Sequence, residues 1–207
     1  MTKGLTLTHL DGQIFTFDAG ALSLELVVTG GRGRRARHEV LHTPADFVQW
    51  AMVSRLDLGR YGVHPAMVRV GVSDLRLVRS LREAIWVSAI NAAGGGRPEP
   101  TDLAAINSTA AYAGVVPQLD PVTREVVWRD PVSARQLIAE IARDAVATFA
   151  EPNIRRIRQC SAPNCYLVYL DTSRPGQRRW CSMQRCGNRK KVTDYRQRQR
   201  LAQHDSG

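Results

Sequence analysis

Cys160-S-A-P-N-Cys165, followed by Cys181-S-M-Q-R-Cys186, is the stretch that decides how the C-terminal part of this 207-residue chain folds. It holds all four cysteines, as two C-x4-C pairs separated by fifteen residues. Thiolates are soft ligands, and structural zinc prefers a closed tetrahedron of four ligands of this kind. Two disulfides or four unrelated thiols are the alternatives. Because the chain shows no export signal and reducing compartments keep thiols free, the pattern favours one structural zinc ion bound by all four cysteines.

The residues between the two cysteine pairs predict a β-hairpin that brings the pairs together. Tyr166-L-V-Y-L-Asp171 favours a strand, Thr172-S-R-P-G-Gln177 is typical of a turn, and Arg178-R-Trp180 leads back to Cys181. A module of this size buries little apolar surface, so its folding depends on metal binding. We therefore expect removal of zinc to unfold it.

The residues around the second cysteine pair resemble a known family. Leu170-D-T-S-Arg174 and Arg178-R-W-C-S-M-Q-R-C-G-N-R-Lys190 are similar to the CGNR zinc finger, and the resemblance spans residues 157–200. That finger closes bacterial proteins described as stress-induced transcription regulators, in which it follows a mixed α/β domain called ABATE. The resemblance implies DNA as the partner of the finger and ligand sensing by the preceding domain.

Residues 1–150 resemble that ABATE domain. Thr43-P-A-D-F-V-Q-Trp50 matches it well, whereas Leu24-E-L-V-V-Thr29 departs from the usual L-D-F-V-N-T run, with Glu25 in place of Asp and Val28 in place of Asn. The resemblance implies that Glu25, Thr29 and Trp50 contribute to binding a small ligand. If the polar groups of this run contact the ligand, the missing amide at Val28 alters or abolishes its binding here.

Positive charge is concentrated at the C-terminal end of the chain. The net charge is +10, and from residue 151 onward thirteen Lys and Arg face four Asp and Glu, whereas the first 150 residues hold sixteen against fifteen. This asymmetry indicates a basic segment that faces a polyanion. No segment approaches the ~20 apolar residues of a membrane span and the N-terminus lacks a signal-peptide core, so we expect a cytoplasmic protein with no membrane partner.

The predicted fold class is α+β, with a mixed helical body (1–150) that carries small N-terminal and central β-hairpins. A treble-clef or ribbon-like zinc module (151–207), made of a β-hairpin and a helix, completes the chain. One hairpin is predicted over residues 5–18, around Asp11-Gly12, and the other over residues 115–129. Cap residues and apolar spacing predict helices at 43–58, 73–93, 101–112 and 130–149.

Three features of the body have less definite interpretations. Residues 22–29 fit a buried strand or a helix. Residues 30–37 are a loop by their glycines, and a phosphate cradle is the alternative, although the Gly-Lys-Ser/Thr ending of a P-loop is absent. Arg76, Arg79 and Arg82 lie off the apolar stripe of the second helix, so we expect them to form a solvated surface.

Residues 187–201 predict a basic helix, since they contain no proline and many Arg, Lys and Gln residues. On a helical wheel, Val192 and Tyr195 form a narrow apolar stripe, and Lys190 can pair with Asp194. If the stripe packs on the zinc hairpin, basic groups flank that contact.

We hypothesise that this helix lies in a DNA groove and contacts phosphates or base edges, aided by the zinc hairpin. The arginines assigned to these contacts are Arg178, Arg179, Arg189, Arg196 and Arg200.

Catalytic motifs are not evident. G-x-S-x-G and H-E-x-x-H are absent and the five histidines are scattered, so we expect no enzyme. The favoured function is a zinc-dependent DNA-binding transcriptional regulator whose N-terminal domain senses a small ligand. The alternatives are a zinc-ribbon adaptor that binds RNA polymerase or another protein, and an RNA-binding protein in which Tyr166, Tyr169 and Trp180 stack on bases.

Overall fold

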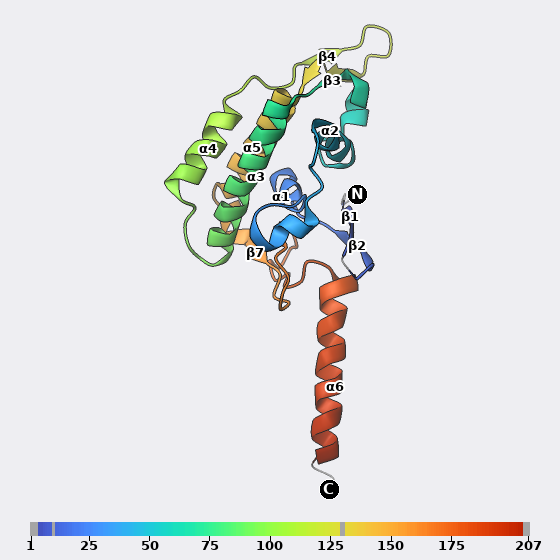
Figure 1. The fold of residues 1–207 in the computed structure, drawn as a ribbon, viewed down its shortest axis with the longest axis vertical. Helices are drawn as coiled ribbons and strands as arrows, with labels where there is room; N and C mark the ends of the chain where they lie inside the picture. Colours follow the sequence, from blue (N-terminus) through green and yellow to red (C-terminus); the bar gives the residue numbers. More distant parts are fainter. Residues whose placement is uncertain (1–3, 10, 129–130, 205–207) are drawn as a thin grey trace.

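A computed structural model of the protein describes residues 4–9, 11–128 and 131–204, apart from the side chains of Tyr61 and of residues 200–204. The chain forms a largely helical body, and the last helix stands out from it (Figure 1). The α-helices are α1 (Leu22–Val27), α2 (Pro44–Val53), α3 (Val72–Ala93), α4 (Pro100–Ala110), α5 (Ala134–Phe149) and α6 (Asn188–His204). Shorter helical turns are η1 (Gly33–His38), η2 (Leu58–Tyr61), η3 (Pro65–Met67), η4 (Asn153–Arg156) and η5 (Met183–Gly187).

The strands of the described residues are short and pair two by two. The antiparallel pairs are β1 (Leu5–Thr8) with β2 (Ile14–Phe17), β4 (Pro117–Leu119) with β5 (Val126–Trp128), and β7 (Ile157–Gln159) with β8 (Val168–Leu170). A parallel pair joins β3 (Val68–Arg69) to β6 (Val132–Ser133). Both predicted hairpins of the body are therefore confirmed.

The core of the body lies where α1, α3 and α5 meet. The apolar stripes of α3 and α5 are buried, as their spacing predicts, and a capping box between Ser133 and Gln136 begins α5. The ambiguous residues 22–29 contain the short helix α1, whose six residues are all buried. Because Ser23 and Glu25 alternate with leucines and are buried like them, the hydrophobic pattern of α1 carries no helical period.

The ends of α2 and α3 differ from their predicted positions. Thr43 caps α2 as expected, yet α2 ends at Val53 instead of near Gly59. There the chain turns back toward α1, because Glu25 accepts a hydrogen bond from Arg55 N at 2.9 Å and pairs with Arg55 Nε at 2.8 Å. At the start of α3, the cap is Gly71 instead of Ser73, and its N–H donates to Asp74 Oδ2 at 2.8 Å.

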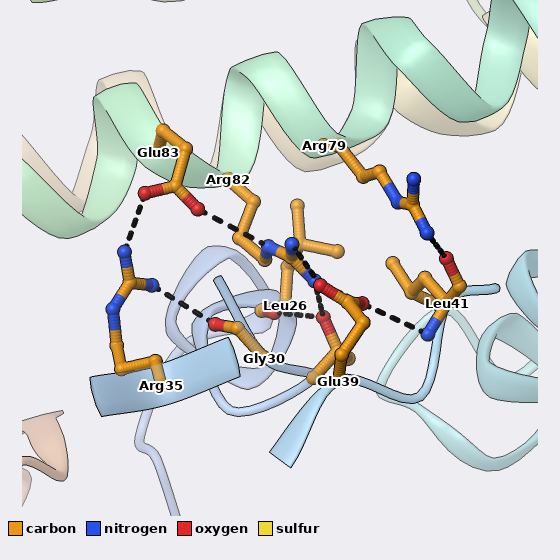
Figure 2. A network of polar contacts seen from close by, with 9 residues as sticks. Leu26, Gly30, Arg35, Glu39, Leu41, Arg79, Arg82 and Glu83 are labelled. Carbon is orange, nitrogen blue, oxygen red and sulfur yellow. Dashed lines mark hydrogen bonds and ion pairs between the residues drawn. The ribbon is translucent and has the colours of Figure 1, made fainter. Parts of the chain in front are cut away.

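The expectation of a solvated arginine surface on α3 is wrong for two of the three residues. The side chain of Arg82 is only 3% exposed, and its Nη2 lies 2.6 Å from Glu39 Oε2. Arg79 turns to the same side and donates to the carbonyl of Leu41, while Arg76 is exposed (Figure 2). Hydrophobic periodicity missed this inward turn because the partners lie in the connection before α2.

The zinc module has the predicted order of hairpin and then helix, but a different pair of strands forms its hairpin. β8 pairs with β7, which precedes the first cysteine, and residues 178–180 form no strand. Their backbone is used elsewhere, since Arg179 O accepts a hydrogen bond from Ser161 N at 2.9 Å. Because Ile157 and Tyr169 are fully buried within the core of the body, the module and the body share one core.

Replacing Arg82 by Ala removes the main cationic partner of Glu39. We expect the free energy of unfolding, measured by urea denaturation, to fall by roughly 3 kcal/mol, because the carboxylate is left poorly solvated. Arg76→Ala on the exposed side of the same helix is the matched control, with an expected change within about 0.5 kcal/mol. A loss in Arg82→Ala no larger than in the control contradicts a structural role of this ion pair.

Candidate metal centre and nucleic-acid interface

The two knuckles of the module bring the four cysteines together. Their Sγ atoms all lie within 4.8 Å of one another, and each cysteine is free of a disulfide. The Sγ atoms of Cys165 and Cys181 are 3.8 Å apart. Ligands at about 2.3 Å from a metal on a regular tetrahedron lie about 3.8 Å apart, so this spacing fits zinc bound by thiolates.

Tight backbone turns aim the sulfur atoms at one point. Cys160 N donates to Leu167 O at 2.9 Å and Cys165 N donates to Ala162 O at 3.2 Å, which closes the first knuckle. Asn164 in this knuckle adopts a left-handed φ of 62°. In the second knuckle, Cys181 N donates to Cys160 Sγ at 3.3 Å. The first pair of cysteines is thus oriented partly by the second.

Without a cation, the four thiols cannot all ionise. Hydrogen bonds to Cys160 and Cys165, followed by burial, raise the pKa of the Cys181 thiol. Hydrogen bonds from Cys165 and Cys181 lower the pKa of Cys160, so the thiols of this cluster titrate as a coupled group. A divalent cation favours all four thiolates by replacing their protons, and metal affinity therefore falls as the solution is acidified.

Two protein families match consecutive parts of the chain. Residues 20–152 match ABATE, described as "Putative stress-induced transcription regulator", and residues 156–199 match the CGNR zinc finger. The chain belongs to the ABATE family. The finger match includes all four cysteines, so the cluster is a structural zinc site with no ligand position left open.

No curated protein matches the chain. Neither ABATE nor the CGNR finger is a class of enzymes. Within the described residues, no helix is both long and apolar enough to cross a membrane.

The N-terminal hairpin, which precedes the matched ABATE region, fastens the second knuckle. Arg185 is 4% exposed at its side chain, donates to Gln13 Oε1 at 2.7 Å and pairs with Asp11 Oδ2 at 3.3 Å. Gln184 Oε1 accepts a hydrogen bond from Thr16 N at 3.0 Å. The backbone N–H of Gln13, followed by Arg185, lowers the pKa of Asp11, which keeps this carboxylate charged. Sequence analysis missed Arg185, because nothing near it signals a partner at residue 11.

The two hairpin arginines assigned to DNA occupy different environments. Arg178 is partly buried, and its guanidinium donates to Asp18 O at 2.8 Å, to Trp180 O at 3.0 Å and to Cys181 O. The same group lies 4.0 Å from the ring centroid of Tyr169. Arg178 therefore clamps the second knuckle to β2. Arg179 is exposed and lies over the ring of Trp180.

Helix α6 is exposed, and it points away from the body (Figure 1). Arg196 is exposed, Arg189 pairs with Asp11, and the side chain of Arg200 lies outside the described residues. The predicted pair of Lys190 with Asp194 is confirmed.

The apolar stripe of α6 is open to solvent, so the condition that it packs on the zinc hairpin is not met. Val192 is 47% exposed and Tyr195 is 58% exposed. Helix α6 extends away from the body (Figure 1), and both side chains are exposed.

The three side chains assigned to a small ligand are buried and engaged with different partners. Glu25 pairs with Arg55. Thr29 Oγ1 donates to Leu26 O at 2.7 Å and accepts from Arg82, and the ring of Trp50 stacks on Phe47 with 6.0 Å between centroids. Glu25 and Thr29 contact different arginines, and the role of all three residues in ligand binding stays a prediction.

Removal of zinc by a chelator should unfold the module and also loosen the body, because β7 and β8 belong to the shared core. We expect the zinc-free protein to lose protease resistance within residues 156–199 and to melt at a lower temperature, with both properties restored by added zinc. Unchanged proteolysis after verified loss of the metal contradicts a structural zinc.

The buried Glu25 should make stability depend on pH. Burial raises its pKa to about 7, against the opposing effect of Arg55. Between the ordinary carboxyl pKa and this value the folded state binds more protons than the unfolded state, so stability falls as pH rises. We expect a loss of up to about 3 kcal/mol across this range. Glu25→Gln should flatten this dependence in denaturant titrations at several pH values, and an equal slope in both proteins would refute it.

Proposed function

We propose that this protein is a transcription regulator that binds duplex DNA through α6, with the zinc centre holding that helix in place. The observation that carries the proposal is the exposure of α6 together with its charge. Six basic residues and one acidic residue lie between Asn188 and His204, and every described side chain of α6 except Asp194 is exposed. A helix that is polar on nearly all sides gains little from packing. A polyanion supplies the missing partner.

The dimensions and charge distribution of α6 suit a DNA major groove. A helix of 17 residues is about 25 Å long, and its width of about 10–12 Å fits a groove about 12 Å wide. On the wheel, Arg189 and Arg196 lie on one flank and Lys191 and Arg198 on the other. Side chains on opposite flanks can reach the phosphates of opposite groove walls, and such contacts position a protein on DNA.

The zinc centre contributes orientation. Cys186 lies in η5, which continues directly into α6, and Arg185 beside it is held by the N-terminal hairpin. The metal ligand and the ion pair together fix the direction in which α6 leaves the body. Loss of zinc therefore abolishes DNA binding even though no described basic side chain of α6 contacts the sulfur atoms.

We further propose that a small ligand of the ABATE domain acts on the finger through β2. A chain of polar contacts supports this route. Glu25 pairs with Arg55, Arg55 pairs with Asp18, and Asp18 O accepts a hydrogen bond from Arg178 of the second knuckle. A ligand that displaces Arg55 would shift the strand end that holds Arg178.

One observation favours an adaptor that binds RNA polymerase or another protein. Val192, Tyr195 and Met183 are exposed apolar side chains on α6 and η5. RNA binding by base stacking has less support, because Tyr169 is fully buried and the hydroxyl of Tyr166 accepts a hydrogen bond from Arg34.

Replacing Arg196 and Arg200 by Ala should weaken binding to a DNA duplex and reduce its salt dependence, by roughly 0.9 in the slope of log K against log salt for each phosphate that is no longer bound. The measurement is fluorescence anisotropy of the zinc-loaded protein over a salt series. The control removes the same charge from exposed residues of β3 and α3 (R69A/R76A), and it should bind like wild type. The proposal is contradicted if the α6 variant keeps the wild-type affinity and salt slope. It is also contradicted if the wild-type protein binds RNA polymerase but does not bind DNA.

A further inference from the structure

The turn η1 presents arginines on the outside of the body. Arg32, which directly precedes η1, and Arg34 and Arg37 within it are exposed, whereas Arg35 is buried. In a 3₁₀ helix, residues three apart lie on the same face, so Arg34 and Arg37 point outward together. Within the part of the chain that the structure describes, the contacts of these two outward side chains are neutral. Arg34 donates to Tyr166 Oη and Arg37 Nε donates to Arg34 O at 3.0 Å.

Two buried ion pairs, one made by Arg35 within η1 and one by Glu39 directly after it, hold η1 in position (Figure 2). Arg35 turns inward, where its Nη2 lies 2.5 Å from Glu83 Oε2 and its Nη1 donates to Gly30 O at 2.9 Å. At the other end, Glu39 pairs with Arg82. A side chain on Gly31, whose φ is 134°, would place its Cβ 2.2 Å from Arg35 Nη1. The outward arginines are thus presented from a fixed backbone, which reduces the entropic cost of binding a partner.

Two contacts place η1 beside the elements that hold α6. The hydroxyl of Tyr166, which directly follows Cys165, accepts a hydrogen bond of 2.5 Å from Arg34. At the end of η1, the ring of His38 lies 6.2 Å from the ring of His9, on the hairpin whose Asp11 pairs with Arg189. Basic groups of the body and of α6 therefore border the same zinc module.

We infer that Arg34 and Arg37 of η1, together with the exposed Arg32 just before it, form a second phosphate-binding surface through which the ABATE domain itself contacts the duplex bound by α6. The inference rests on the proposed function and adds a DNA contact outside the finger. Arginine suits this task because its planar guanidinium donates two parallel hydrogen bonds to a phosphate. Contacts of this kind carry no sequence information but fix the orientation of the protein on DNA.

The test is the double variant Arg32→Ala and Arg37→Ala in the full zinc-loaded chain, which leaves the contact of Arg34 with Tyr166 in place. Anisotropy with a random-sequence duplex should show weaker binding and a salt slope reduced by about 0.9 per phosphate, or about 1.8 for both arginines. The matched control is again R69A/R76A, because β3 and the start of α3 lie at the end of the molecule opposite α6 (Figure 1). Zinc content and melting temperature verify folding, and Arg34→Ala serves as a second variant if the first is unstable.

The outcomes separate this inference from the function it rests on. Only the inference is overturned if the wild type binds DNA, the α6 variant binds more weakly, and both η1 variants behave like the control. Absence of wild-type binding to duplex DNA overturns both. If the η1 variants lose affinity only for single-stranded RNA, the assignment of η1 to duplex DNA is overturned. A salt slope that is smaller in the η1 variants than in the control supports the assignment.

Discussion

Four sulfur atoms that lie within 4.8 Å of one another impose the constraint on which the C-terminal part of this protein depends. Four thiolates this close repel one another unless a cation lies among them. Protonated thiols carry no charge that attracts a cation, so they do not hold the two knuckles together. Cys160 follows a strand in the core of the body, and Cys186 lies in the turn that becomes α6. The zinc site therefore links the packed core to the exposed basic helix.

The arginines of this chain serve two purposes that composition alone does not separate. Arg35, Arg82 and Arg185 are buried and paired with carboxylates, and Arg178 clamps three backbone carbonyls. A guanidinium with five donors can satisfy several acceptors at once, which suits it to such internal positions. The arginines proposed for DNA are mostly exposed, and Arg189 shows the boundary between the two groups because it pairs with Asp11 while it remains open to solvent.

The finger and the ABATE domain form a continuous structure. The hairpin of β1 and β2 precedes the matched ABATE region, yet it contacts the second knuckle and the first turn of α6. Next to the first knuckle, η1 contacts Tyr166, which directly follows Cys165. Because the module is held by the body on both knuckles, a change in the body has direct routes to the orientation of α6.

Local chemistry alone determined much of this protein. The zinc ligands follow from cysteine spacing, the start of α2 from the cap at Thr43, the first hairpin from Asp11-Gly12, and the basic helix from composition. These features depend on residues close together in the chain. Tertiary structure decided the rest, namely the pairing of β8 with β7, the burial of Arg82, the internal use of Arg178 and the exposed stripe of α6. The positions of Arg82, Arg178 and the α6 stripe depend on which distant segment supplies, or fails to supply, a partner, and no spacing within the sequence encodes that partner. For β8, candidate partner strands lie nearby on both sides in the chain, and it pairs with β7, whose Ile157 is buried in the shared core.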